Sequence, residues 1–273
     1  MRRETFQTPE PIAVEIHNAA GAIEVETAET DETVVELEPL RDNEGSHAAV
    51  EEARVELRGS RLVVDVGDRS FFGLTLNINR DVRVTVRAPH GSSVAATGAS
   101  ADIDLRGRLG SLEAKTASGD LRAEDIAGDA RVKSASGDVA IARIGGGANV
   151  QSASGDVAIK ELGGDGQIRT ASGDVNVGEA GGGVALVTAS GDQRLGSVTA
   201  GRVELKSASG DILVGVRRGS RAWLDVRSIS GDAESELPVG ETVDDEEGPF
   251  VEITATSMSG DIRVARASET AHA

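Results

Sequence analysis

The chain has 273 residues, of which 38% are apolar, 27% are charged and 2% are aromatic, and it contains no cysteine. The lack of cysteine excludes disulfides, thiolate metal sites and cysteine catalysis. The formal net charge of −18 argues against nucleic acid or an anionic membrane as a partner, because both attract basic surfaces. With so few aromatic side chains, the core must consist of Val, Ile, Leu, Ala and other small residues.

Residues 1–95 are predicted to form irregular β-structure that caps the array described below. Short segments of this region alternate apolar and polar residues, which indicates strands. These segments are 11–17, 22–26, 33–38, 53–58, 61–66 and 82–87. A solenoid needs such capping coils, because an open strand edge invites aggregation. No apolar run reaches the roughly 18 residues of a membrane span, and the first residues lack the apolar stretch of a secretory signal. We therefore expect no membrane insertion and a cytoplasmic location.

Residues 96–273 carry an internal repeat. The tripeptide Ser-Gly-Asp recurs in steps of 18 residues from Ser118 to Ser190, and then at Ser209, Ser230 and Ser259. Each repeat holds two short alternating runs separated by glycine turns, as in SGDVAIARIGGGANVQSA from Ser136. Eighteen residues are too few for a strand–helix–strand unit. The repeat instead predicts an all-β fold, a β-solenoid with two strands per coil of about 18 residues, stacked in chain order and right-handed by the crossover rule.

Alternation assigns the two faces of each coil. Val132, Val139 and Ile141 are predicted to point inward, and Ser134 and Ser136 share the parity of Val132. The stacked inward hydroxyl column then reads Thr116, Ser134, Ser152, Thr170, Thr188, Ser207, Ser228 and Ser257. We expect these hydroxyls to bond to one another or to turn carbonyls, because a buried polar group needs a partner.

A column of aspartates ends the turns. Its members are Asp120, Asp138, Asp156, Asp174, Asp192, Asp211, Asp232 and Asp261. Neighbouring coils would bring these carboxylates to about 5 Å, which costs roughly 1 kcal/mol per pair in water. The favoured interpretation is that each aspartate caps its own glycine turn by accepting a backbone N–H. The alternative is a Ca²⁺ site built on the first six, since Ca²⁺ prefers oxygen ligands. No other metal or cofactor is expected.

Other candidate sites have simpler structural interpretations. An outward basic column is expected to balance nearby carboxylates; it comprises Lys115, Lys133, Arg169, Lys206 and Arg227. Phe71 and Phe72 follow a polar loop and are candidates either for packing in the cap or for a partner contact. The four histidines show neither metal-ligand spacing nor a triad pattern. We therefore predict no catalytic residues and no enzyme.

Three segments, together with the Ser-Gly-Asp array, resemble a known family. They are VRVTVRAPHG at 82–91, AWLDV at 222–226 and SGDIRV at 259–264. The combination is similar to the bacterial β-strand-repeat "putative adhesin" family, a domain of unknown function, and most of all to its soluble actinobacterial branch. The resemblance implies a β-repeat fold, supplies no catalytic residues, and connects related modules with cell-envelope stress signalling.

These features favour a non-enzymatic β-solenoid that serves as a scaffold or protein-interaction module with an unidentified protein partner. The resemblance adds a link to envelope-stress signalling. The alternative is an adhesin-like surface or glycan-binding module. A polysaccharide-active enzyme is disfavoured, because the central repeats show no local break of the kind that forms an acid–base cleft. We expect a monomer or a small homo-oligomer formed through the Phe71–Phe72 loop or an end coil, since the like-charged sides repel.

Overall fold

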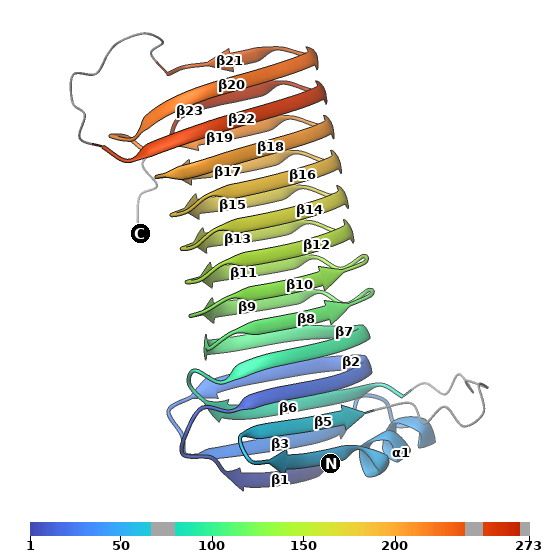
Figure 1. The fold of residues 1–273 in the computed structure, drawn as a ribbon. Coiled ribbons are helices and arrows are strands. Elements are labelled where there is room, and N and C mark those ends of the chain that lie inside the picture. Colours follow the sequence, from blue (N-terminus) through green and yellow to red (C-terminus); the bar gives the residue numbers. More distant parts are fainter. Residues whose placement is uncertain (67–79, 238–247, 268–273) are drawn as a thin grey trace. The chain divides into compact units, whose positions relative to one another are not determined.

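The computed structural model describes residues 1–66, 80–237 and 248–267. The predicted all-β solenoid with two strands per coil is confirmed (Figure 1). The chain forms two compact units, Met1–Ile141 and Ala142–Ala273, which are described in turn. In the described residues, no helix is both long and apolar enough to cross a membrane.

Unit 1 contains one helix and the first strands of the chain. Its elements are β1 (Arg2–Gln7), β2 (Ala13–Ala28), β3 (Glu32–Pro39), α1 (Glu44–Glu52), β4 (Arg54–Arg58), β5 (Arg61–Val66), β6 (Val82–Pro89), β7 (Ser93–Leu109), β8 (Leu112–Thr116), β9 (Leu121–Ile126) and β10 (Ala130–Ser134), with β11 (Val139–Ile144) running out of it. The alternating segments 11–17 and 22–26 form the two halves of one strand, β2, rather than two strands. Strand β1 was not predicted.

The N-terminal strands pair in both directions. The first half of β2 pairs in parallel with β5 and β7, and its second half with β6 and β7. The β2 coil therefore lies between the β5/β6 coil and β7. Beyond it the pairing turns antiparallel, in β1–β3, β3–β6 and β4–β5. These antiparallel pairs, of which β4–β5 is a hairpin, are the irregular part of the fold, because parallel coils alone would continue the stack.

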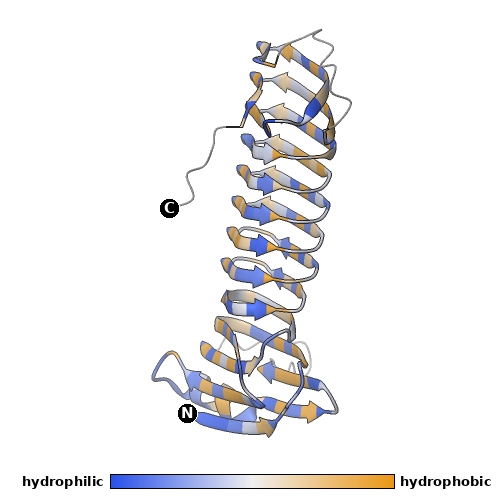
Figure 2. Ribbon diagram, turned by 90° about the vertical axis from the view of Figure 1, so that its left-hand side faces the viewer, coloured by the Kyte–Doolittle hydropathy of each residue, from blue (hydrophilic) through white to orange (hydrophobic). Residues whose placement is uncertain are grey.

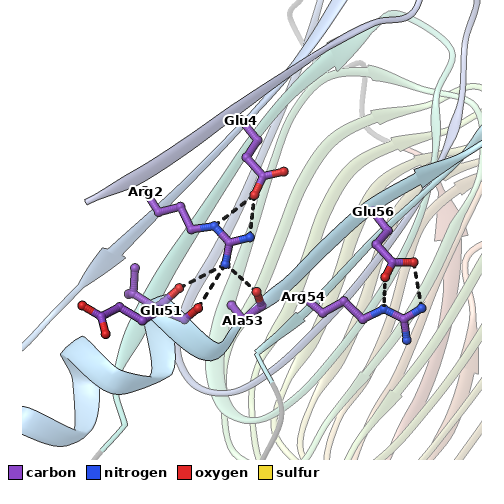
Figure 3. A network of polar contacts seen from close by, with 7 residues as sticks. Arg2, Glu4, Glu51, Ala53, Arg54 and Glu56 are labelled. Atoms are coloured by element: carbon purple, nitrogen blue, oxygen red, sulfur yellow. Dashed lines mark hydrogen bonds and ion pairs between the residues drawn. The ribbon is translucent and has the colours of Figure 1, made fainter.

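Helix α1 is an element that the strand pattern did not predict. The Asn43 side chain caps its N-terminus by accepting the Ser46 N–H at 2.7 Å. The last turn of the helix has no basic residue. Arg2, on β1, supplies the positive charge instead: its Nη1 donates to the Ala53 carbonyl at 2.5 Å, and its Nη2 donates to Glu4 at 2.6 Å (Figure 3). A guanidinium at a helix C-terminus offsets the negative end of the helix dipole.

Unit 2 consists of stacked coils. Its strands are β12 (Ala148–Ser154), β13 (Val157–Leu162), β14 (Gly166–Ser172), β15 (Val175–Ala180), β16 (Val184–Ser190), β17 (Gln193–Val198), β18 (Gly201–Ser209), β19 (Ile212–Val216), β20 (Arg221–Ser230), β21 (Ala233–Ser235), β22 (Phe250–Ser259) and β23 (Ile262–Arg266). Val157 pairs with Val175 and Ile168 with Leu186, so one coil takes 18 residues in both of its strands.

The inward face is apolar, as predicted. Val132, Val139 and Ile141 are at most 2% exposed, and Figure 2 shows apolar and polar residues alternating along the strands. Some inward hydroxyls bond as expected: Ser134 Oγ donates to the Gly137 carbonyl at 3.0 Å. The expectation is wrong at Ser152 and Ser257, whose buried hydroxyl oxygens have no hydrogen-bond partner among the described residues. The inward assignment of Ser136 was wrong, because its side chain is exposed. The strand ends at Ser134, so alternation no longer applies at Ser136.

The last coils do not stack in chain order, which corrects the sequence interpretation. Strand β18 pairs with β22, and β22 pairs with β20 (Figure 1). Likewise β19 pairs with β23, and β23 with β21. The final coil of the chain is thus inserted between the β18/β19 coil and the β20/β21 coil, and the hydroxyl column reads Ser207, Ser257, Ser228.

Hydrophobic burial explains this order. The inserted coil places Ile262 and Val264 inward on β23, and both are at most 1% exposed. Their register partners on β21 are Ala233 and Ser235, which are exposed. Placing the β22/β23 coil inside the stack buries its larger apolar side chains between two neighbouring coils. The β20/β21 coil, whose second strand has smaller side chains, is left at the end of the stack.

Candidate functional site: the aspartate ladder

Each Ser-Gly-Asp turn depends on its glycine. At Gly191 the backbone has φ +134°, and a Cβ added there would lie 2.2 Å from the Gly173 carbonyl oxygen of the preceding coil. Gly173 repeats the pattern, with φ +125° and 2.4 Å to the Gly155 carbonyl oxygen. The turns are therefore stacked so closely that only glycine fits both the conformation and the space. This stacking sets the aspartates of neighbouring coils in one column.

The aspartates of unit 2 form a hydrogen-bonded ladder between coils. The backbone N–H of Asp174 donates to Oδ1 of Asp156, and that of Asp192 donates to Oδ1 of Asp174, both at 2.8 Å. The ladder continues through Asp211 and then follows the coil order, to Asp261 and finally Asp232. In unit 1, Asp120 and Asp138 make the same contact with the preceding coil at 3.1 Å. We call this column the aspartate ladder.

The expectation that each aspartate caps its own turn is thus corrected. The carboxylate accepts from the neighbouring coil because the strand ladder is interrupted at the turn. The residue after each aspartate resumes the backbone ladder: Val175 N–H donates to the Asp192 carbonyl at 2.9 Å. The aspartate N–H has no such carbonyl, and the carboxylate takes its place. A hydrogen bond from N–H to a charged acceptor also offsets part of the repulsion between stacked carboxylates.

An open groove of about 530 Å³ borders the ladder in unit 2. Acidic side chains line it together with two arginines: Asp174, Asp192, Asp211, Asp261, Arg194 and Arg263. Within residues 1–66, 80–237 and 248–267 no group of three or more His, Asp or Glu side chains is placed to hold a metal ion. Ca²⁺ binding by the ladder stays the untested alternative to a purely structural role, and it has a direct test.

We expect Asp174→Asn to leave the melting temperature unchanged or raised, because the amide oxygen still accepts the Asp192 N–H and one charge is removed. Asp174→Ala should lower the free energy of unfolding by about 1 kcal/mol, because the acceptor is lost. Thermal melts of both variants measure this difference.

Millimolar Ca²⁺ should raise the melting temperature of the wild-type chain no more than Mg²⁺ does. A Ca²⁺-specific rise of many degrees that disappears in Asp156→Asn/Asp174→Asn would establish a metal ladder instead.

Three of the five members of the outward basic column, Lys115, Lys206 and Arg227, form ion pairs with acidic neighbours on their own strands. Lys115 lies 2.7 Å from Glu113, and Arg227 lies 2.8 Å from Asp225. The hydrogen bond from Lys115 holds the pKa of Glu113 below its ordinary value. Lys206 likewise lowers the pKa of Glu204. These contacts agree with the charge-balancing interpretation of the column, and exposed pairs of this kind contribute little to stability.

Phe71 and Phe72, the candidate contact residues, lie outside the described residues. The described part of unit 2 holds a different apolar surface, which the sequence interpretation missed. It consists of two apolar pairs at the two ends of β20, with the outward Asp225 and Arg227 between them. One pair is Trp223 of β20 and Phe250 of β22, which are 49% and 50% exposed, and the other is Ile229 of β20 and Met258 of β22, which are 78% and 59% exposed. We call it the C-terminal apolar patch. The sequence did indicate this surface. The position just before each Ser-Gly-Asp tripeptide is alanine in the regular repeats, but it is Ile229 and Met258 in the last two repeats.

Family comparison agrees with this architecture. The model of the family described as Toastrack DUF4097 matches residues 12–181 and 180–273. The chain belongs to the Toastrack DUF4097 family. This membership confirms the resemblance to a bacterial β-repeat family of unknown function that the segments around the Ser-Gly-Asp array indicated. No curated protein matches the chain.

Three solved bacterial structures illustrate what this Toastrack chain is similar to. A "putative adhesin" from Bacteroides fragilis is 15% identical, with 96% of each chain covered and a TM-score of 0.37. A "putative adhesin" from Parabacteroides distasonis is 9% identical, with 96% of this chain and 97% of that chain covered and a TM-score of 0.45. A "putative lipid binding protein" from the same species is 14% identical, with 96% of each chain covered and a TM-score of 0.41.

Proposed function

We propose that this Toastrack chain is a non-enzymatic scaffold that binds a protein partner through the C-terminal apolar patch. The supporting observation is where the exposed large apolar side chains lie. Trp223, Ile229, Phe250 and Met258 lie on the two adjacent strands β20 and β22, whereas the described residues of the regular coils of unit 2 hold no exposed large apolar side chain. Aromatic and methionine side chains gathered on a surface are typical of protein-binding sites.

The rest of the scaffold is suited to present such a patch. The coils are fixed by closely stacked glycine turns and by the aspartate ladder, so the two strands are held on a rigid support. The net charge of −18 opposes non-specific contacts with nucleic acid and acidic proteins. A pre-ordered apolar surface loses little conformational entropy when a partner binds.

Affinity capture from lysate of the native cells tests this proposal. We expect the wild-type chain to retain a protein partner that the variant Trp223→Ser/Ile229→Ser/Met258→Ser loses. The matched control is Val187→Ser, which removes an outward, half-buried apolar side chain from a regular coil. Loss of the partner in both variants, or in neither, would contradict a role for the patch.

The adhesin-like alternative would require a glycan-binding surface instead of a protein-binding one. Glycan-binding sites commonly stack sugars on open aromatic faces. Among the described residues, the exposed large aromatic side chains are Trp223 and Phe250, and the guanidinium of Arg221 lies 5.9 Å from the Phe250 ring centroid. Cell fractionation separates the two functions: native chain found outside the cytoplasm would favour the surface or glycan-binding alternative over a cytoplasmic scaffold.

A further inference from the structure

Within residues 142–237 and 248–267, strand β20 ends the stack of unit 2 with an open edge. Among the described residues, β20 pairs only with β22, and the Arg221 N–H donates to the Pro249 carbonyl at 2.9 Å. In a parallel ladder each residue directs its N–H and its carbonyl to the same neighbour, and successive residues alternate. Arg221 and the odd-numbered residues as far as Arg227 therefore engage β22; the alternation ends before Ser230, whose carbonyl accepts from the Gly260 N–H. The residues that direct their backbone groups away from β22 are Ala222, Leu224 and Val226.

The core is also open at this coil. Leu224 and Val226 are the inward side chains of β20 and lie in register with Ile253 and Ala255 of β22. The β22 residues are fully buried, whereas Leu224 and Val226 are only partly buried. Unpaired backbone groups next to partly buried core side chains form a template for another strand.

The outward face of β20 is self-complementary in one antiparallel register. With Val226 opposite itself, Asp225 faces Arg227 of the second copy, and Trp223 faces Ile229 of the second copy. Both pairs occur twice, because the arrangement is two-fold symmetric. The outward-directed backbone groups of Leu224, Val226 and Ser228 then meet their counterparts, as hydrogen bonding requires.

The neighbouring registers that satisfy the same backbone rule are less favourable. Centring the pair on Asp225 places this carboxylate opposite itself, and centring it on Arg227 does the same for the guanidinium. Centring it on Leu224 places Arg221 opposite Arg227. Like charges directly opposite each other destabilise a strand pair. Charge therefore selects the register centred on Val226.

We infer that the chain forms a two-fold homodimer in which β20 pairs antiparallel with β20 of a second copy about Val226. This inference rests on the proposed function, because it names a second copy as an occupant of the same end coil. The in-strand ion pair of Asp225 and Arg227, at 2.8 Å, becomes part of a four-charge group across the axis. This two-fold interface pairs the open β20 edge of one copy with that of the other. No open β20 edge is then left, so association stops at two copies and forms no filament.

Single-cysteine cross-linking tests the register, since the chain has no cysteine of its own. In Val226→Cys the two Cα atoms should lie about 5.5 Å apart, within the range that a disulfide spans. Mild oxidation should therefore give a covalent dimer. The matched control is Leu224→Cys, whose two copies are offset by four residues, about 13 Å along the strands, and should not cross-link. Equal cross-linking of both variants would overturn the proposed register.

Light scattering during size exclusion tests the association itself. We expect the wild-type chain to be a dimer. In Arg227→Asp the dissociation constant of the dimer should rise at least about tenfold, because Asp225 then faces a second carboxylate. The charge swap Asp225→Arg/Arg227→Asp should restore the dimer, because it keeps opposite charges opposed. A monomeric wild type would overturn the inference, although the capture experiment above could still support a different partner. A monomer that binds neutral phosphatidylcholine vesicles, and loses this binding in Trp223→Ser, would assign the patch to a membrane instead.

Discussion

Replacing Gly191 with alanine is expected to lower the free energy of unfolding by about 4 kcal/mol. About 1–3 kcal/mol comes from forcing a non-glycine residue to φ +134°. A further 1–3 kcal/mol or so comes from overpacking, because the new Cβ would lie 2.2 Å from the Gly173 carbonyl oxygen unless the backbone shifts. Urea unfolding followed by circular dichroism measures the change.

Gly219→Ala is the matched control for this substitution. Gly219 has a positive φ of 86°, but no atom lies within 4 Å of the position that a Cβ would take there. The control should therefore lose only the conformational part, about 1–2 kcal/mol. If Gly191→Ala costs no more than Gly219→Ala, the turns of neighbouring coils are not in close contact.

Excising residues 174–191 should preserve the fold. The deletion removes one coil, β15 and β16, and joins Gly173 directly to Asp192. Ile168 then takes the place of Leu186 opposite Leu205, and Thr170 takes the place of Thr188 opposite Ser207. Inward residues, turn glycines and the aspartate ladder keep their register, so the loss should equal roughly the stacking energy of one coil.

Excising residues 174–182 removes only half a coil and should be far more damaging. It joins Gly173 to Gly183 and moves the next Ser-Gly-Asp turn to the opposite edge of the coil. The aspartate ladder is broken, and the strands after the junction meet mismatched neighbours. Circular dichroism and thermal melting compare the two deletions. Equal stability of both would mean that the structural repeat is nine residues rather than 18.

The regular coils were predictable from sequence because one local pattern determines them. Alternation places Val132 and Ile141 inward, and glycine at a fixed spacing marks each turn. Stacking then follows, because coils of equal length bring like residues into register. The same logic predicted the aspartate column and its inward hydroxyl neighbours, such as Thr188, whose Oγ1 donates to Ser207 Oγ at 3.2 Å.

The repeat pattern does not determine contacts between residues that are far apart in the sequence, such as the order in which the last coils stack. The turns at Ser230 and Ser259 carry the same Ser-Gly-Asp motif, so the motif alone allows either coil to follow the β18/β19 coil. The deciding difference is the larger apolar content of β23, with Ile262 and Val264, compared with β21. Helix α1 was missed because it is short and its terminal charge comes from Arg2, some 50 residues away in sequence. The aspartate's acceptor role was predicted, but its donor lies on the neighbouring coil.

The order of the last three coils is the feature on which the open β20 edge and the dimer depend, and paired cysteines test it directly. Lys206 is in register with Thr256, and Thr256 with Arg227. Under mild oxidation we expect rapid disulfide formation in Lys206→Cys/Thr256→Cys and in Thr256→Cys/Arg227→Cys. Lys206→Cys/Arg227→Cys should stay reduced, because two strand spacings, about 9.6 Å, separate these positions. Rapid cross-linking of Lys206→Cys with Arg227→Cys would show that the coils stack in chain order and would contradict the inserted final coil.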